Sequence, residues 1–539
     1  MVRPARRHAP DRQHEVGPCP AARYRYPVAG TNRRGTDYNQ QERKRPRMNT
    51  QAPAARADQQ QTEPLPDLSQ IDIAPNARKT LWLAAIVAAI CGGLYGYDTG
   101  IVSGALLLIT RDFHLSSFLQ EMVASAILAG AVMGSLLTGW MSEHFGRRKS
   151  IMIVTAIFVL GALACAFSPG VYTLIVSRVF LGLAVGGSTQ VVPMYISELA
   201  PAHKRGHMVT MFNIAIGIGI FAANIIGFAA RDAWGWRPMV AIAAIPAAVV
   251  FISMFFLPKS PRWAAEHESL DSALEQLQRI RTSERDIRRE MRRIHANANE
   301  ETDPRDIGWR GIRQPWVRPA LVAALGVAFF TQAGGLEMMI YYAPTFLSDA
   351  GFGSSSALMA SIGISIIYLV MTVLGSNIVD RIGRRRLVLV MGPGSVLSLI
   401  GLGIMFLVHP QPGSPGSWLI IAFMLLFMVF NAGGIQVVGW LLGAEMFPLS
   451  MRGNATSLHS AMLWGSDLLV TSTALTLVTK ITLGGTMWFY AGVNLLSVLF
   501  VYFMVPETRG ASLEDIEEAL REGRFRPTRG NTAIVEEEE

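Results

Sequence analysis

The amino-acid sequence predicts an all-α membrane protein with twelve transmembrane helices in two parallel six-helix halves. Three observations carry this prediction. The 539-residue chain is 50% hydrophobic and only 16% charged, whereas a soluble domain has about 25% charged residues. Apolar runs recur along it, each approaching the roughly 20 residues that cross a bilayer as a helix. Two charged motifs occur twice, six such runs apart.

The apolar runs give the helices in order. Stretches such as LWLAAIVAAICGGLYGY and LIIAFMLLFMVF hold no charged residue, so nothing in them opposes burial in hydrocarbon. The predicted helices cover residues 80–109, 118–140, 150–168, 171–196, 207–230, 237–257, 317–347, 355–378, 386–408, 417–446, 453–479 and 484–505.

The first repeated motif follows the second and the eighth predicted helix. It reads Glu143-His-Phe-Gly-Arg147-Arg-Lys and then Asp380-Arg-Ile-Gly-Arg384-Arg-Arg. A repeat offset by six helices keeps its membrane orientation, which makes the two halves parallel. This arrangement is typical of transporters that rock one half against the other around a midplane site.

The second repeated motif follows the fourth and the tenth helix. It reads Glu198-x-x-Pro-x-x-x-Arg205-Gly and then Glu445-x-x-Pro-x-x-x-Arg452-Gly. An arginine binds a carboxylate through a planar, bidentate fork. We therefore expect the acids and arginines of both motifs to form a cytoplasmic gate, pairing across the halves when that gate closes. The alternative is surface ion pairs worth little each.

Clusters of Lys and Arg predict the orientation. If twelve helices alternate, these clusters all lie on one side, which the positive-inside rule makes cytoplasmic. The opposite side has short loops with few charges, such as HPQPGSPG. The clusters are GRRK (146–149), HKR (203–205), the loop 259–315, GRRR (383–386), Arg452 and the C-terminal tail.

These boundaries divide the chain into five parts. We expect a disordered N-terminal tail (1–77), a first six-helix half (78–257), a cytoplasmic linker with amphipathic helices (258–316), a second six-helix half (317–506), and a cytoplasmic C-terminal helix and tail (507–539).

The first 47 residues account for the whole net charge. They hold 12 of the 48 Lys and Arg and 4 of the 40 Asp and Glu, which leaves 36 of each sign in the rest of the chain. Three interpretations stay open: an upstream start assigned in error, a disordered tail, or an arm that binds nucleic acid or anionic lipid. Without an apolar h-region the segment is not a signal peptide.

Cofactor chemistry finds no support in the sequence. Cys19, Cys91 and Cys165 have neither metal nor redox spacing. No Gly-rich loop ends in Lys-Ser or Lys-Thr, so we do not expect ATP to drive the protein.

Several motifs in order resemble the sugar-porter family of the major facilitator superfamily, over about residues 80–520. Besides the two repeats, they are GYDTGIVSGAL (96–106), PKSPRW (258–263), the YYAP within 331–344, and PETRG (506–510). The resemblance implies the major facilitator fold and alternating access to a central site.

Two charged residues in the N-terminal half fit a proton site. Asp98 lies in GLYGYDTG, and Arg178 begins RVFLGLAVGG in the fourth helix. Burial favours the neutral acid and a neighbouring arginine the ionised one, so a modest change in access could load or unload a proton. Proton-coupled members of the family carry such a pair, which implies this role here. The alternative is a structural pair that neutralises itself.

The seventh helix departs from the family pattern. Hexose and pentose porters typically read Gln-Gln-x-x-Gly-x-Asn-x-x-x-Tyr-Tyr, and this chain reads Thr331-Gln332-x-x-Gly-x-Glu337-x-x-x-Tyr341-Tyr342. The resemblance therefore implies that Glu337 faces a cavity, in place of a sugar-binding Asn. Gly334 and Gly335 favour a broken helix at this point. The other substrate-binding residues that the resemblance implies are Asn213, Tyr368, Trp440, Trp464 and Asp467.

The two acids leave the substrate open. Glu337 and Asp467 could accept hydroxyl groups of a sugar or polyol, attract an amine, form a second proton site, or be protonated and structural. We expect a secondary active transporter, not an enzyme, that takes up a monosaccharide or polyol together with a proton. The alternatives are a facilitator, a porter of an amine-bearing substrate, a proton-driven exporter, and a sensor that binds sugar without moving it.

The expected setting follows from the same reasoning. We expect a lipid-embedded monomer in the inner (plasma) membrane, with both termini in the cytoplasm. Its partners would be a small-molecule substrate and a proton, with no cofactor, no metal and no nucleic acid.

Overall fold

The structure, a computed structural model, describes most of the chain. The described residues are 65–68, 71–201, 204–230, 233, 235–298, 303–411, 414–448, 450–511 and 513–526. Most of the predicted tail 1–77 lies outside them, as do Cys19 and residues 527–539. In the described part of that tail, the Ala74 N–H donates to the Gln278 carbonyl at 3.1 Å.

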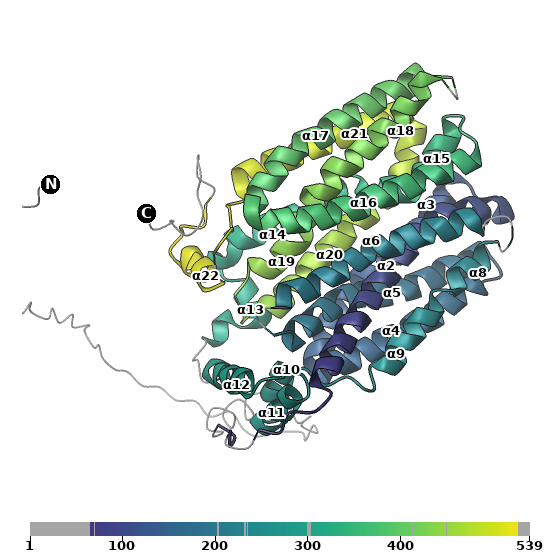
Figure 1. Ribbon diagram of the computed structural model, residues 1–539. Helices are drawn as coiled ribbons and strands as arrows, with labels where there is room; N and C mark the ends of the chain where they lie inside the picture. Colours follow the sequence, from purple (N-terminus) through teal and green to yellow (C-terminus); the bar gives the residue numbers. More distant parts are fainter. Residues whose placement is uncertain are drawn as a thin grey trace, which may run out of the picture. The chain divides into compact units, whose positions relative to one another are not determined.

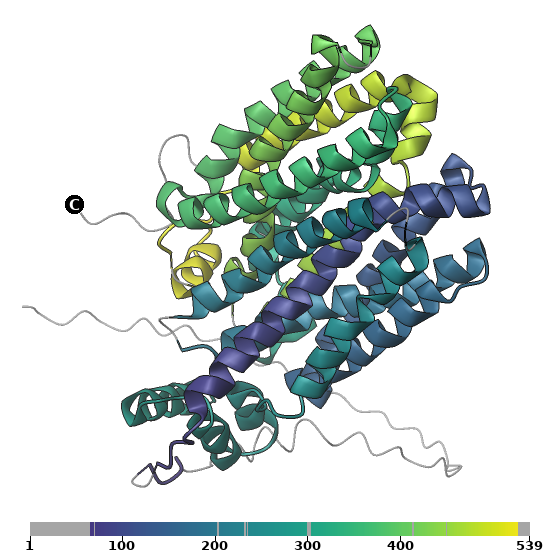
Figure 2. The ribbon, with the colours of Figure 1, turned by 45° about the vertical axis from the view of Figure 1, so that its right-hand side comes forward.

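Two groups of long helices lie side by side in the described residues (Figures 1 and 2). The N-terminal half runs from α2 to α9 and the C-terminal half from α14 to α21, with short linker helices between them and α22 after them. The helices are α2 (Ala77–Phe113), α3 (Ser117–Phe145), α4 (Arg147–Ala166), α5 (Val171–Leu199), α6 (Arg205–Ala229), α8 (Trp236–Ala241), α9 (Ala244–Ser253), α10 (Pro261–His267), α11 (Leu270–Gln278), α12 (Glu284–Ala298), η2 (Pro304–Asp306), α13 (Gly308–Ile312), η3 (Pro315–Val317), α14 (Arg318–Ala333), α15 (Leu336–Asp349), α16 (Ser354–Ile382), α17 (Arg384–Val408), α18 (Pro415–Gly433), α19 (Ile435–Glu445), α20 (Arg452–Thr471), α21 (Ala474–Met504) and α22 (Leu513–Arg521).

Helix length and composition fit a membrane protein. Among the described residues, 11 helical spans are long and apolar enough to cross a bilayer, with α8–α9, α14–α15 and α18–α19 each forming one span. The remaining long helix, α20, is less apolar because it carries Arg452, His459 and Asp467. With α20, the spans make the twelve helices that the sequence predicts.

The outer surface of the helices is apolar. Ile245, Leu397 and Phe503 are each more than 60% exposed. Soluble monomers rarely expose large contiguous apolar surface, so these faces are suited to lipid chains.

Close contact between α2 and α6 depends on a glycine. A Cβ atom at Gly96 would overlap the carbonyl oxygen of Ile216 on α6. Small residues at such points let helix backbones approach closely. The contact fixes α2, which carries Asp98, within the N-terminal half.

Three membrane helices are interrupted in the C-terminal half. α14 and α15 break at Gly334–Gly335, as the sequence predicted, and Gly335 has a φ of 87°. α18 and α19 break at Gly434, where the sequence predicted one helix over 417–446. A Cβ atom at Gly434 would lie 2.7 Å from the Phe430 carbonyl oxygen, so a larger residue would not tolerate this bend.

The third interruption concerns the predicted helix 453–479. α20 ends at Thr471, and the chain resumes helical geometry at Ala474. α21 itself bends at Ile481–Thr482, where Thr482 has a φ of 67°. The outer part of the predicted eleventh helix is therefore a short helical segment, Ala474 to Lys480. It is separated from α20 by the interruption and joined to the rest of α21 through the bend.

The two ends of the helices differ. Helices α10–α13 and α22 gather at one end of the bundle, which we call the linker side (Figure 1). Both Gly-Arg-Arg motifs lie there, at the starts of α4 and α17. The opposite end, where α2 turns into α3 at residues 114–116, is called the far side.

The linker helices are bound to the N-terminal half by polar contacts. The buried Arg281 donates to the carbonyl oxygens of Leu199 and Ala200 at the end of α5, and pairs with Glu290 at 2.8 Å. Because unpaired carbonyls at a helix end need donors, Arg281 holds the linker against the motif that contains Glu198.

Candidate functional site

A buried ion pair lies inside the N-terminal half. The Asp98 Oδ2 atom on α2 is 3.7 Å from Arg178 Nη2 on α5, and their side chains are 7% and 4% exposed. This separation exceeds that of a good N–H···O hydrogen bond. In the described residues Arg178 Nε and Nη2 also have no hydrogen-bond partner. The two charges thus neutralise each other at a distance that small helix movements can change.

A vestibule leads from the linker side to the centre of the molecule. It is a cavity of about 190 Å³ between α6, α16 and α19. Asp380 and Glu445 line its linker-side end, and Asn213, Tyr368 and Trp440 line it deeper inside. Three residues that the sequence assigns to the substrate site therefore share one cavity with three residues that it assigns to the gate, Asp380, Arg384 and Glu445.

Glu337 lies just beyond the broken point of the seventh membrane helix. Its side chain is buried, and the Tyr95 side chain on α2 lies near its carboxyl group. In the described residues its Oε2 atom has no partner. The break lets α15 begin at Leu336 with Glu337 in its first turn. A carboxylate oxygen is thereby left available in the core.

Other buried polar atoms nearby are unpaired as well. Neither amide atom of Gln332 has a partner in the described residues, and neither does Asp467 Oδ2. The other Asp467 oxygen accepts from the Thr471 hydroxyl at 3.1 Å. Asp467 also lies close enough to Glu337 for the two carboxyl groups to interact electrostatically. The carboxylates are therefore neighbours on α15 and α20.

Three aromatic rings meet at the centre. The Trp440 and Trp464 rings are 6.2 Å apart, and the Tyr95 ring lies 5.1 Å from Trp464 and 6.4 Å from Trp440. Tyr95 comes from the N-terminal half and the tryptophans from the C-terminal half. Trp464 also donates from Nε1 to Thr189 Oγ1 at 3.2 Å.

Sequence reasoning missed Tyr95. Its spacing could have revealed it, because a residue three before Asp98 lies on the same face of a helix. Gln436, which also lines the vestibule, was missed too.

Two predicted substrate residues have their polar groups engaged elsewhere. The Thr331 hydroxyl donates to the Val327 carbonyl one turn back, and its side chain packs where a Cβ at Gly439 would lie. The Tyr342 hydroxyl donates to the Thr471 carbonyl at 2.9 Å. Tyr341, by contrast, is buried with its hydroxyl near Thr99 on α2. The structure thus groups Tyr341 with the central residues, and leaves Thr331 and Tyr342 facing their own half.

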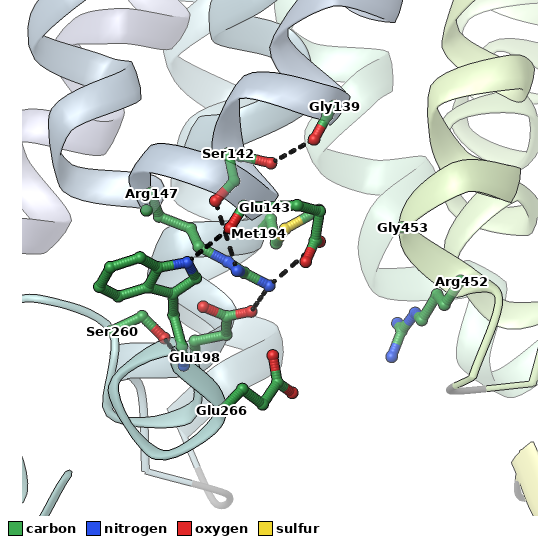
Figure 3. Close-up of polar contacts among 12 residues, drawn as sticks. Gly139, Ser142, Glu143, Arg147, Met194, Glu198, Ser260, Glu266, Arg452 and Gly453 are labelled. Carbon is green, nitrogen blue, oxygen red and sulfur yellow. Dashed lines mark hydrogen bonds and ion pairs between the residues drawn. The ribbon is translucent and has the colours of Figure 1, made fainter. Parts of the chain in front are cut away.

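The predicted gate residues of the N-terminal half form an ion-pair cluster (Figure 3). Arg147 pairs with Glu198 at 3.2 Å and with Glu143 at 3.5 Å. The indole nitrogen of Trp263, on linker helix α10, donates to the Glu143 carbonyl. The linker therefore braces this cluster.

The C-terminal half repeats the arrangement. Arg384 pairs with Glu445 through two contacts of 2.8 and 3.0 Å, and with Asp380 at 2.8 Å. Glu507, from PETRG, accepts the backbone N–H groups of Arg384 and Arg385 at 2.8 and 3.1 Å. Glu507 thus caps the start of α17, a role that was not predicted and that explains the acid in this motif.

Arg205 and Arg452 are the exceptions among the gate residues. Neither forms an ion pair with another described residue at 4.0 Å or less, and Arg452 stands apart from the Arg147 cluster in Figure 3. Each is the first residue of its helix, α6 and α20 respectively. In this conformation, with the vestibule open, the ion pairs therefore lie within the halves.

Comparisons with known proteins agree with this architecture. The sugar (and other) transporter family matches residues 84–520. The D-xylose transporter of Levilactobacillus brevis is 37% identical over 440 residues, covering 80% of this chain and 94% of that protein. The galactose-proton symporter of Escherichia coli is 33% identical over 447 residues, covering 82% and 95%.

A solved structure shows the same fold. The partially occluded inward-open conformation of the xylose transporter XylE from E. coli matches with a TM-score of 0.69 and 25% identity, covering 80% of this chain and all of that one. The chain therefore belongs to the sugar-porter family of the major facilitator superfamily.

Proposed function

We propose that this protein is a secondary active transporter that takes up a monosaccharide or polyol together with a proton by alternating access. The observation that carries this proposal is the group of unpaired polar atoms at the centre, from Gln332, Glu337 and Asp467, beside a cluster of aromatic rings. Leaving a buried polar group unsatisfied costs roughly 1–3 kcal/mol. A ligand with several hydroxyl groups would satisfy these atoms.

The aromatic rings favour the same class of ligand. A sugar ring has apolar C–H faces as well as hydroxyl groups, and small-molecule sites combine aromatic walls with a few placed polar groups. Tyr95, Trp440 and Trp464 supply the walls, and Asn213 and Tyr368 line the deeper part of the vestibule. The D-xylose transporter and the galactose-proton symporter among the relatives support a sugar substrate and proton coupling.

The proton would bind at Asp98. When the Asp98–Arg178 pair is intact, both groups are charged and neutralise each other. Protonation of Asp98 would free Arg178 and let α2 and α5 shift relative to each other. The 3.7 Å separation supports this role, because the pair has no close hydrogen bond to break when Asp98 takes up a proton.

The conformation is inward-facing in this proposal. The linker side carries the Lys and Arg clusters, so it would face the cytoplasm with both termini. The vestibule then opens inward, and the ion pairs within each half would exchange for pairs that include Arg205 and Arg452 when it closes. One chain supplies both halves of the site, so we propose a monomer in the plasma membrane.

A panel of ligands tests the substrate class. The purified protein in liposomes is loaded with unlabelled hexoses, pentoses, inositols or amino sugars, one at a time, and counterflow of the labelled compound is measured. Counterflow with a neutral sugar or polyol is the expected result. Counterflow with none of them would refute the proposed substrate.

A porter of an amine-bearing substrate is the second candidate. Glu337 and Asp467 are two neighbouring acids, and in the described residues neither forms an ion pair with a basic side chain. A fixed negative charge would attract an ammonium group. Glu337→Gln should then weaken binding of an amino sugar far more than of its neutral parent. If Glu337→Gln weakened binding of both sugars equally, the negative charge of Glu337 would not favour an amine-bearing substrate.

A further inference from the structure

A buried carboxylate joins the two halves on the far side. Glu121, in the second turn of α3, is 1% exposed. Its Oε1 atom accepts the backbone N–H of Thr476 at 2.6 Å, and its Oε2 atom accepts the Thr476 hydroxyl at 2.6 Å. Each carboxylate oxygen therefore takes one short hydrogen bond from the other half.

These two bonds are the polar contacts that the structure gives Glu121. No ion pair joins it to a basic side chain within 4.0 Å in the described residues. Hydrogen bonds to an ionised acceptor are short and about twice as strong as neutral ones. A buried carboxylate that loses such partners must be rehydrated. The contact is therefore stable only while the far side stays shut.

Thr476 occupies a hinge-like place in the chain. It lies in the short segment between the interruption at Ser472–Thr473 and the bend at Ile481–Thr482. The helix just before the interruption, α20, carries Trp464 and Asp467 of the central site. The Tyr342 hydroxyl on α15 binds Thr471 at the end of α20. Glu121 is thus bonded to the segment that directly follows α20, which in turn is bonded to α15 through Thr471.

We propose that Glu121 is a positioning residue of the transport cycle, which holds the far side closed in this inward-facing conformation and must release Thr476 before the site can open outward. The inference rests on the proposed alternating access. Glu121 does not touch the substrate in it; it acts through the segment that follows α20.

The size of the effect follows from the contact. A glutamine at position 121 keeps one acceptor oxygen and loses the charge and the second acceptor. Losing a charge-assisted hydrogen bond shifts a two-state equilibrium by about tenfold or more. Glu121→Gln should therefore raise the outward-open population about tenfold, and Thr476→Val, which keeps the backbone N–H, should raise it less.

The experiment reports how often the far side opens. Ser125 lies one turn deeper than Glu121 on the same face of α3 and is 3% exposed. Its replacement by cysteine supplies a labelling site that becomes accessible from outside only when the far side opens. The two native cysteines of the described residues, Cys91 and Cys165, are buried. Whole cells are treated from outside with a membrane-impermeant thiol reagent, and the labelling rate of the Ser125→Cys protein is measured with and without external sugar.

A matched control separates loss of the Glu121–Thr476 contact from a general loosening of the far side. Asp112 lies on the same side and accepts the Trp236 indole N–H at 2.9 Å, but both residues belong to the N-terminal half. We expect Glu121→Gln to raise labelling about tenfold and Asp112→Asn to change it less than twofold. If Glu121→Gln does not fold, Thr476→Val gives the same test with a smaller increase.

The outcomes separate the inference from the proposed function. One outcome would overturn only the proposed role of the Glu121–Thr476 contact. In it, labelling depends on sugar, but Glu121→Gln and Thr476→Val label no faster than Asp112→Asn. If no sugar changes the labelling rate of the Ser125→Cys protein, both the proposed alternating access and the role of the Glu121–Thr476 contact are overturned.

Discussion

The two halves of this transporter share one architecture but treat buried charge in opposite ways. In the N-terminal half, α2 and α5 are continuous helices, and their buried charges, Asp98 and Arg178, face each other. In the C-terminal half, the helices that bear the site are interrupted, and Glu337 and Asp467 have no basic partner in the described residues. One half pairs its buried charges internally, whereas the other leaves buried polar atoms unpaired among the described residues.

The difference has a physical basis. A continuous helix satisfies its own backbone hydrogen bonds and leaves no backbone group free inside the membrane. A break within the membrane is tolerated only where it is buried in protein or lines a cavity. The breaks at Gly334–Gly335 and Gly434 lie beside the central residues. We infer that the N-terminal half is suited to reversible protonation and the C-terminal half to shaping a site around a substrate.

The largest expected effect breaks the charge balance of the N-terminal half. Arg178→Gln leaves Asp98 buried without its partner, and removing one member of a buried pair costs about 3–5 kcal/mol. The free energy of unfolding, measured by denaturant titration in micelles, should fall by about this amount.

The matched variant for this prediction is the double replacement Asp98→Asn with Arg178→Gln. It removes both charges, so it should recover most of the lost stability. A double variant as unstable as the sum of its single changes would mean that the two residues do not act as a pair.

The next effect concerns the unpaired acids of the C-terminal half. Glu337→Gln removes a charged acceptor, and hydrogen bonds to charged groups contribute about 1.5–3 kcal/mol. The KM for the transported sugar should therefore rise about tenfold to a hundredfold, with little change in unfolding free energy. Uptake at graded sugar concentrations measures it.

Thr331→Val is the control for Glu337→Gln. The Thr331 hydroxyl is already bonded to Val327 within its own helix, so its loss should change KM less than threefold. An equal rise in KM for both variants would contradict the assignment of Thr331 away from the substrate.

A smaller effect tests the break itself. Gly335 has a φ of 87°, a conformation that costs other residues roughly 1–2 kcal/mol. Its Cβ would also lie 3.0 Å from the Tyr490 ring. Gly335→Ala should lower the thermal stability and weaken sugar binding, because it strains the turn that determines the position of Glu337 at the start of α15.

Gly353→Ala is the matching control, since Gly353 has a φ of −64° and open space around it. It should leave both quantities unchanged. If Gly335→Ala behaves like Gly353→Ala, the break does not depend on the backbone freedom of glycine.

Much of the fold could be predicted from the sequence. Apolar runs of bilayer length and motifs repeated six helices apart are local features, and they gave the twelve helices and the two halves. The break at Gly334–Gly335 was predicted from adjacent glycines. The interruption at Gly434 was not predicted, although Gly433 and Gly434 are adjacent glycines as well. The interruption after Thr471 was not predicted either, because a Ser-Thr pair is also common inside membrane helices.

The site was less predictable, since it depends on side-chain direction after helices bend. Thr331 and Tyr342 match the family pattern, but their hydroxyl groups bond to backbone carbonyls of their own half. Tyr95, Glu121 and Glu507 gain their roles from partners far away in the sequence. The spacing of Tyr95 from Asp98 and the motif that contains Glu507 mark these two positions, but neither signal names the distant partner, and nothing around Glu121 in the sequence marks it at all.

The most direct test of the central claim, that Asp98 couples a proton to sugar movement, is the pH outside energy-depleted cells in a weak buffer. Adding the sugar identified by counterflow should make the medium alkaline in cells with the native protein. Cells with Asp98→Asn should show no such change while still exchanging labelled sugar. Alkalinisation that persists in Asp98→Asn cells would contradict the account.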